Sequence, residues 1–285
     1  MTRLRTAAIA LLLTGALAAP ALAAGDEQIH IDRQKWTFGG FFGHFDNAQL
    51  QRGFKVYVEA CARCHGIKRL YFRNLAEPGG PQFVEGGVKT LAAGYQIEDG
   101  VDDQGKPRKR NGILADAIPG PYKNEQEARA AQNGALPPDL SLIIRARAVE
   151  THAPFYMVPL NMVSDVLRGY QESGADYVYA YLNGFMDTPP PNVKMADLMN
   201  YNKVFPGHQT AMANPFRAGD GLVKYDDDTP ATIENYSRDV VAFLAWASDP
   251  KLEERKRIGL LVMGYLAITA FLMFLAKRRV WSKVH

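Results

Sequence analysis

The feature that most constrains this 285-residue chain is the spacing of its two cysteines, which lie in the sequence CARCH at residues 61–65. A CxxCH sequence is typical of c-type haem attachment. Cys61 and Cys64, three residues apart on a helical turn, can each form a thioether with one vinyl group of a single porphyrin. His65 is then held beneath the iron as an axial ligand. The motif predicts one covalently bound haem c.

Other uses of two cysteines fit the chain less well. A thioredoxin-like CxxC expects a neighbouring βαβ pattern, and a structural zinc site needs a second ligand pair; the sequence has neither. Two cysteines three positions apart also make no disulfide framework. With a formal net charge of +3 and no long basic stripe, the chain is not expected to bind nucleic acid.

Residues 1–23 have the pattern of a secretory signal. Arg3 and Arg5 precede an apolar stretch over residues 7–17, and residues 21–23 read Ala-Leu-Ala, a small-x-small cleavage pattern. The sequence therefore predicts export and cleavage near Ala23. The exported c-type haem domain is expected to cover residues 24–250.

A second apolar segment, Ile258–Ala276, contains no charged residue. At about 1.5 Å of rise per residue, it is close to the roughly 30 Å thickness of a bilayer core. We expect residues 251–277, with their basic flanks, to form one membrane anchor helix. Because the N-terminus is exported, the haem domain should lie in the periplasm of a bacterium. Residues 278–285 should then form a cytoplasmic tail below the inner (cytoplasmic) membrane.

The haem motif is expected at the end of a helix that begins near residue 46. Asp46 is placed as its N-cap, and Gln49, three residues later, is placed to complete a capping box. An apolar stripe at helical spacing then runs as far as Cys61. Gly53, beside that stripe, is costly in a helix and indicates close approach of another backbone.

The rest of the domain is predicted to be helical and rich in loops. Residues 66–140 contain many glycines and prolines, which favour loops with brief helices. A helix is expected over 176–182. Another should begin with Thr229 as N-cap and Pro230 at its first position, present an apolar face from Ile233 to Ala247, and end at Asp249–Pro250.

The sixth ligand of the iron is less constrained, since methionine and histidine are both usual. The methionines outside the apolar ends of the chain are Met157, Met162, Met186, Met195, Met199 and Met212. Met212 lies in a loop between Pro206 and Pro215, which can carry it to the face opposite His65. His208 in the same loop is a further candidate, so the spacing leaves several ligands open.

Residues 28–277 resemble the cytochrome c1 family, the haem subunit of the cytochrome bc1 complex (ubiquinol–cytochrome c reductase). The CxxCH motif alone marks any c-type cytochrome. The more specific segments are NGALPPDLS at 133–141, RAR at 145–147, ADYVY at 175–179, the 206–212 loop, TPAT at 229–232 leading into DVVAFL at 239–244, and RKR at 255–257.

The resemblance implies a mainly α, class I c-type cytochrome fold with large loop insertions, plus one C-terminal transmembrane helix. It also implies that Met212 is the sixth ligand and that Arg147 lies near a haem propionate. A backbone carbonyl of the Pro137–Pro138 stretch would orient the His65 imidazole. Residues 148–174 depart from the family pattern as an insertion.

The function implied is electron transfer from a Rieske iron–sulfur protein to a soluble cytochrome c. The implied partners are cytochrome b, the Rieske subunit and the lipid bilayer, within a dimeric complex. The alternative is a tethered monohaem subunit of another respiratory complex, such as an oxidase. A haem peroxidase or nitrite-type reductase would need an open iron position and usually a second haem. A gas sensor would need a signalling region, which we do not expect after Lys277.

Two acidic clusters suggest how a soluble partner docks. Acidic residues gather at 98–103 and at Asp226–Asp228, although basic residues lie near both. A basic cytochrome c would be steered by such a surface. We therefore expect its reduction to slow as ionic strength rises.

Overall fold

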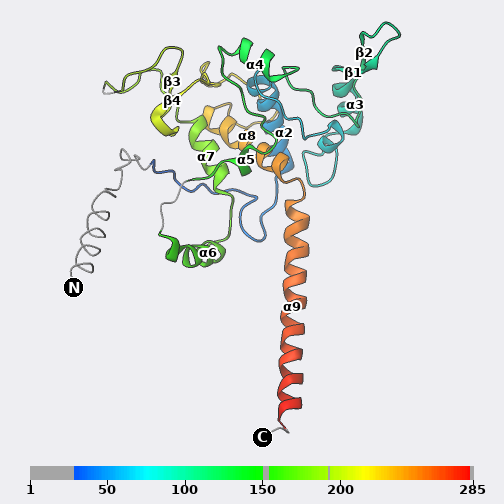
Figure 1. Cartoon of the computed structure of the whole chain (residues 1–285), viewed down its shortest axis with the longest axis vertical. Coiled ribbons are helices and arrows are strands. Elements are labelled where there is room, and N and C mark those ends of the chain that lie inside the picture. Colours follow the sequence, from blue (N-terminus) through cyan, green and yellow to red (C-terminus); the bar gives the residue numbers. More distant parts are fainter. Residues whose placement is uncertain (1–28, 150–153, 192, 283–285) are drawn as a thin grey trace, which may run out of the picture. The chain divides into compact units, whose positions relative to one another are not determined.

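The computed structural model describes residues 29–149, 154–191 and 193–282 (Figure 1). The signal sequence expected at residues 1–23 lies outside them. The α-helices are α2 (Asn47–Val56), α3 (Glu85–Ala93), α4 (Glu125–Ala131), α5 (Ile143–Ala146), α6 (Val158–Leu167), α7 (Ser173–Leu182), α8 (Ile233–Ser248) and α9 (Leu252–Trp281). Shorter turns are η1 (Tyr57–Cys61), η2 (Phe72–Leu75), η3 (Phe155–Met157) and η4 (Pro206–His208). The expected mainly helical class is confirmed.

Four short strands form two antiparallel pairs. Strand β1 (Gln96–Val101) pairs with β2 (Pro107–Asn111), and β3 (Asn200–Tyr201) pairs with β4 (Gln209–Thr210). The first hairpin falls in the region where only loops and brief helices were expected. Most of its side chains are exposed, so no alternation of apolar and polar residues marks it in the sequence.

Helix α2 begins as the sequence predicts, with one difference. The Asp46 carboxylate accepts hydrogen bonds from the backbone N–H groups of Ala48 and Gln49, at 2.8 and 3.2 Å. The predicted capping box is wrong, because the Gln49 side chain does not bond back to the N-cap; its amide donates instead to Asp239 Oδ1 on α8 at 3.1 Å. The cap is thus one-sided, and Gln49 links two helices.

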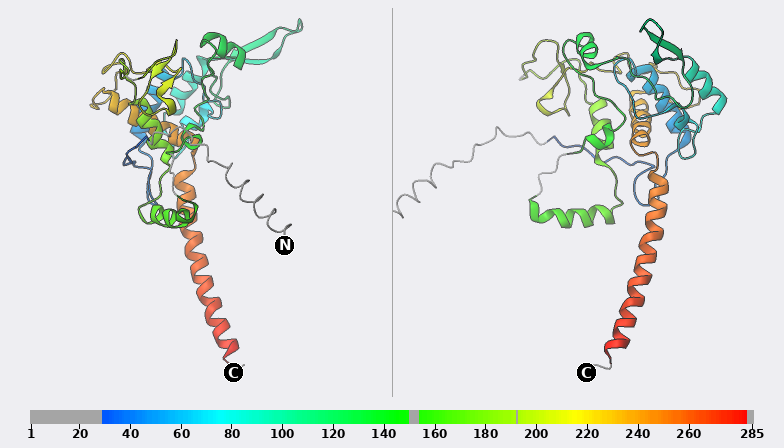
Figure 2. Two further views of the ribbon diagram at one scale, coloured as in Figure 1. Left: turned by 60° about the vertical axis from the view of Figure 1, so that its left-hand side comes forward. Right: turned by 45° about the vertical axis from the view of Figure 1, so that its right-hand side comes forward.

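Helices α2 and α8 pack against each other (Figure 2). A Cβ built on Gly53 would lie 2.0 Å from the backbone oxygen of Asp239. The predicted close approach of another backbone is therefore confirmed. Arg52 adds an ion pair from its Nε to Asp239 Oδ2, at 2.9 Å.

Helix α8 begins three positions later than expected. Its N-cap is Thr232, whose hydroxyl accepts from the Asn235 N–H at 3.3 Å, so the prediction of Thr229 as N-cap is wrong. The reason is that the Pro230 carbonyl accepts from the N–H of Thr232 and from the Asn235 amide, which makes a turn ahead of the helix. The expected apolar face is buried from Tyr236 to Ala247, and Ile233 at its start is half-buried.

Helix α9 contains the expected anchor segment. It runs over 30 residues, and its most apolar window has a mean hydropathy of 2.4 with none of its residues buried. At about 1.5 Å per residue, a helix of this length exceeds the thickness of a bilayer core. Its first turn is tied to the domain, since Glu253 Oε1 accepts from the Phe45 N–H and Lys256 Nζ donates to Phe38 O.

Candidate functional site

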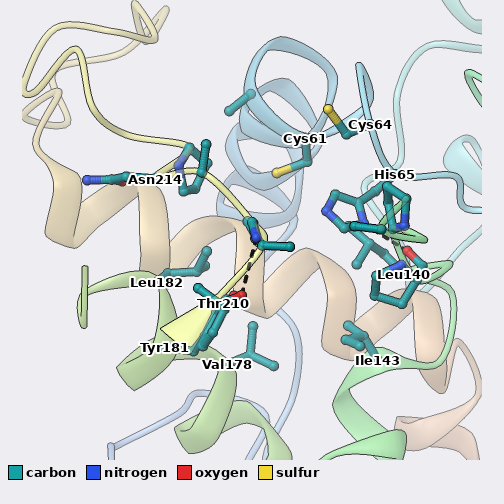
Figure 3. Close-up of a pocket in the computed structure, with 18 of the residues that line it drawn as sticks. Cys61, Cys64, His65, Leu140, Ile143, Val178, Tyr181, Leu182, Thr210 and Asn214 are labelled. Atoms are coloured by element: carbon teal, nitrogen blue, oxygen red, sulfur yellow. Dashed lines mark hydrogen bonds between the residues drawn. The ribbon is translucent and has the colours of Figure 1, made fainter. Parts of the chain in front are cut away.

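One cavity of about 490 Å³ opens between η1, the segment 132–143, α7, the loop 205–215 and α8 (Figure 3). Its volume lies within the roughly 300–1,000 Å³ typical of ligand sites. Its surface is mainly apolar. The aliphatic side chains that line it include Leu136, Leu140, Ile143, Val178, Leu182, Val240 and Leu244. Such a cavity suits a large apolar ligand.

The two cysteines lie on one wall of this cavity, where α2 passes into the π-helical turn η1. The Ala62 N–H donates to Tyr57 O at 2.8 Å, which adds one residue to the last turn before the motif. Such π-helical turns often occur at functional sites. Cys61 is a buried thiol and Cys64 a half-buried one. Burial raises the pKa of Cys61 to about 12, so its sulfur is held in a neutral form.

The His65 ring faces the same space as Cys61 (Figure 3). Its Nδ1 lies 2.8 Å from the carbonyl oxygen of Pro138. Because a carbonyl oxygen can only accept, Nδ1 must carry the proton, and the lone pair of Nε2 is left for a ligand. Burial lowers the pKa of His65, although the Pro138 hydrogen bond and Asp139 oppose this effect. The imidazole is thus neutral at pH 7, the form that binds a metal.

The segment after Pro138 is held against the residues that follow the motif. The Leu140 N–H donates to Gly66 O at 2.8 Å, and the Lys68 N–H donates to Asp139 Oδ2 at 3.0 Å. These long-range bonds fix the position of the Pro138 carbonyl relative to His65.

Met212 also lines the cavity, and it is the one methionine among the six candidates that does so. Its backbone N–H donates to Thr210 Oγ1 at 3.3 Å, and the Tyr181 hydroxyl lies 2.9 Å from the same oxygen. Thr210 and Tyr181 are seen across the cavity from Cys61 and His65 in Figure 3. The loop therefore carries Met212 to the cavity that also holds the CxxCH motif.

The other candidate ligands lie elsewhere. Met186, Met195 and Met199 line a separate small cavity of about 130 Å³. Met157 and Met162 are exposed. His208 is half-buried, stacks on Tyr201, and its Nδ1 lies 3.3 Å from Asn202 O.

Basic side chains lie at the edge of the cavity. Arg147 lines it, is exposed, and donates from Nη1 to Ala146 O at 3.0 Å. Arg63, inside the CxxCH motif, lines the same cavity. Two guanidinium groups can bind carboxylates of a ligand there.

Two residues that support the site were missed from the sequence. Asn202 is fully buried, and its Oδ1 accepts from the N–H groups of Val204 and Phe205 while its amide donates to Tyr181 O. It thereby fixes the start of the loop that carries Met212. Gln132 contacts Cys64 Sγ at 3.6 Å. Their contacts with Tyr181 and Cys64 join residues 21 and 68 positions apart, so no local pattern in the sequence reveals them.

The donor set fits a haem better than a bare metal ion. Among the described residues there is no group of three or more His, Cys, Asp or Glu side chains that could hold a metal. A structural zinc ion needs four such ligands. An iron held by a porphyrin needs the protein only at its two axial positions, and one histidine with one methionine is a common pair.

The helical fold, the cavity with its CxxCH wall and the apolar helix α9 together define a class, haem proteins anchored by one C-terminal helix. Residues 36–284 match the Cytochrome C1 family, and the chain belongs to this family. The resemblance found in the sequence is thereby confirmed. So is the expected fold class, a class I c-type cytochrome fold with large loop insertions and one C-terminal apolar helix.

Several characterised proteins are similar to the chain along most of its length. It is 45% identical to "Cytochrome b/c1" of Bradyrhizobium diazoefficiens, over 98% of this chain and 40% of that protein. It is 43% identical to "Cytochrome c1" of Blastochloris viridis, over 99% of this chain and 97% of that protein. It is 39% identical to "Cytochrome b-c1 complex catalytic subunit, mitochondrial" of Candida albicans, over 96% and 85%. Haem binding follows from membership of the family.

Proposed function

We propose that this chain carries one covalently bound haem c and passes electrons from a Rieske iron–sulfur protein to a soluble cytochrome c, as a subunit of a quinol–cytochrome c reductase. The observation that carries the proposal is that Cys61, Cys64, His65 and Met212 all line one apolar cavity. The names of the Bradyrhizobium and Candida relatives refer to cytochrome b/c1 and the b-c1 complex, which supports the choice of complex.

The haem supplies reversible one-electron chemistry of its iron. Cys61 and Cys64 would bind it as thioethers. His65 would bind the iron through Nε2. The Pro138 carbonyl would hold the ring in one tautomer and one orientation, since it accepts from Nδ1.

Met212 would bind the iron through its thioether sulfur. A thioether sulfur favours reduced iron and so raises the reduction potential. That suits a carrier placed late in a chain of electron transfers. Thr210 and Asn202 would act as positioning residues, because their hydrogen bonds fix the path of the loop.

Arg147 would bind a haem propionate at the edge of the cavity, and Arg63 is placed to assist. A guanidinium group can bind a carboxylate through two parallel hydrogen bonds. The apolar remainder of the wall would exclude water from the iron.

The membrane topology belongs to the same proposal. Residues 1–23 would direct export, residues 24–250 would form the periplasmic domain, residues 251–277 would cross the bacterial inner membrane, and residues 278–285 would be cytoplasmic. Cytochrome b and the Rieske protein would be permanent partners in a dimeric complex.

The test is purification of the full chain from its membrane in mild detergent. Cytochrome b and an iron–sulfur protein should accompany it, and haem should stay with the polypeptide in acidic organic solvent. Haem that is freely extracted would refute covalent attachment. Co-purification with the copper- and haem-containing subunits of an oxidase would instead favour the alternative, a tethered subunit of an oxidase.

A further inference from the structure

Helix α6 lies in the 148–174 insertion, to which the haem site gives no role. None of its residues, and none of the preceding turn η3, is buried. Phe155 and Leu167, at the two ends of this segment, are 87% and 82% exposed. Large exposed apolar patches usually mark an interaction surface.

The segment is amphipathic. At about 100° per residue, its polar side chains share one face: Asn161, Ser164, Asp165 and Arg168. The opposite face carries Pro159, Met162, Val163, Val166 and Leu167, all of them exposed. A helix with this pattern and no buried residue needs a cover for its apolar face.

The end of α6 is tied to the base of α9. The Gly40 N–H donates to Tyr170 O at 2.8 Å, and Tyr170 lies three residues beyond the end of α6. The same loop, residues 38–43, accepts from Lys256 Nζ through Phe38 O and Gly43 O, at 2.7 and 3.4 Å. Lys256 lies two residues before Ile258, where the uncharged segment begins.

The tip of this loop is apolar and exposed as well. Phe42 is 85% exposed and Phe41 is 47% exposed. Two separate apolar groups, Phe41–Phe42 and α6, are therefore joined by hydrogen bonds to the turn of α9 that precedes its uncharged segment.

From this arrangement we infer that α6, together with Phe41–Phe42, lies in the interfacial layer of the bilayer that α9 crosses. Basic side chains at the end of a span lie at the level of the lipid headgroups. Lys256 therefore places the 38–43 loop at that level, because two helical residues rise only about 3 Å. Amphipathic helices bind this layer with their apolar face towards the acyl chains.

The charge of α6 favours a tethered contact over independent binding. Its polar face has one basic residue, Arg168, against one acidic residue, Asp165, so attraction to anionic lipid contributes little. The anchor α9 holds α6 beside the bilayer and so raises its effective concentration there. The inference depends on α9 crossing the membrane and is independent of the proposed haem ligation.

The test uses the full haem-loaded chain in phosphatidylcholine–phosphatidylglycerol vesicles, with a nitroxide on one introduced cysteine. Val163→Cys reports the apolar face, Asp165→Cys the polar face of the same helix, and Val84→Cys, an 81% exposed position before α3, reports water. The chain without an introduced cysteine, treated with the same nitroxide reagent, shows whether Cys61 or Cys64 is labelled. An unchanged absorption spectrum checks the folding of each variant.

The measurement compares how often the nitroxide collides with oxygen, which concentrates in lipid, and with a water-soluble nickel chelate. For an interfacial helix, the ratio of oxygen collisions to nickel-chelate collisions at position 163 should be at least about threefold higher than at position 84. The ratio at position 165 should lie between these two values. A value at 163 equal to that at 84 would place α6 in water and overturn the inference. Exclusion of both reagents from position 163 in the purified complex would mean that a protein subunit covers the helix, which also overturns it.

Discussion

The contact at Gly53 gives the sharpest test of how α2 and α8 pack. In Gly53→Ala, the new Cβ would lie 2.0 Å from Asp239 O and 2.7 Å from Phe243 Cβ. Neither neighbour can turn away, since one is helix backbone and the other is the first atom of its side chain. Overpacking of this kind typically costs about 1–3 kcal/mol or more, and a helical alanine regains at most about 1 kcal/mol.

We expect Gly53→Ala to lose about 2 kcal/mol of folding free energy. For a domain of this size, that corresponds to a fall in Tm of roughly 4–8 °C. Circular dichroism of the full chain in detergent, scanned at one fixed rate, measures the change. The visible spectrum should shift too, because Val240 and Leu244 of α8 line the cavity.

Gly87→Ala is the matched control. Gly87 lies within α3, and a Cβ there meets nothing within 4 Å. This variant should gain about 0.5–1 kcal/mol from helix propensity alone. If Gly53→Ala were as stable as Gly87→Ala, the two helices would not pack at the distance described.

Three further predictions concern ligation, acid stability and docking. Met212→Leu should lower the reduction potential by roughly 0.1–0.3 V, a part of the roughly 0.8 V that axial ligands span, and make the haem reactive to carbon monoxide; redox titration measures this. The hydrogen bonds from Arg110 lower the pKa of Asp116 from an ordinary value of 3.8 to about 2. The pair should therefore stabilise the fold fully above about pH 4, and this stabilisation should be lost as the pH falls towards 2. Asp226→Asn should change the rate of cytochrome c reduction less than about twofold at physiological salt, because Lys55 pairs with Asp226 at 2.9 Å and screening is strong beyond about 8 Å.

Each of these predictions has its own control. Met199→Leu, in the separate small cavity, should leave the reduction potential unchanged. If Met212→Leu also left the potential unchanged, a residue other than Met212 would be the ligand. In Asp116→Asn, Tm should fall less between pH 4 and pH 2 than it does in the unsubstituted chain. If Asp226→Asn slowed the reaction tenfold, the Lys55 pair would not neutralise that carboxylate in solution.

The parts of the fold that local sequence encodes were predicted. The Asp46 cap, the helix that leads to Cys61 and the long apolar run of α9 depend on residues within a few positions of one another. Gly53 was informative for a related reason, since a glycine inside an otherwise good helix is costly unless a backbone passes close by. The CxxCH motif likewise carries its chemistry in five adjacent residues.

Two predictions about helix starts were wrong, one because of a local turn and one because of a distant partner. The capping of α8 moved to Thr232 because the Pro230 carbonyl takes part in a turn that the Thr-Pro pattern does not reveal. Gln49 was expected to complete a capping box, yet Asp239, nearly two hundred positions away, offers it a better-placed acceptor. The Gln49 bond is a tertiary contact that overrides a local preference, whereas the α8 cap is moved by a local turn within residues 230–235.

The second axial position shows the same limit most clearly. Spacing alone left six methionines and His208 open, since no pattern in the sequence of residues 206–215 reveals where the loop runs. Its path depends on Asn202, which bonds Tyr181 on α7 and the N–H groups of Val204 and Phe205. A buried amide with three backbone partners can hold only one loop conformation without leaving a polar group unsatisfied. Met212 reaches the cavity because of that constraint, so the wall opposite His65 is set by α7 as much as by the loop itself.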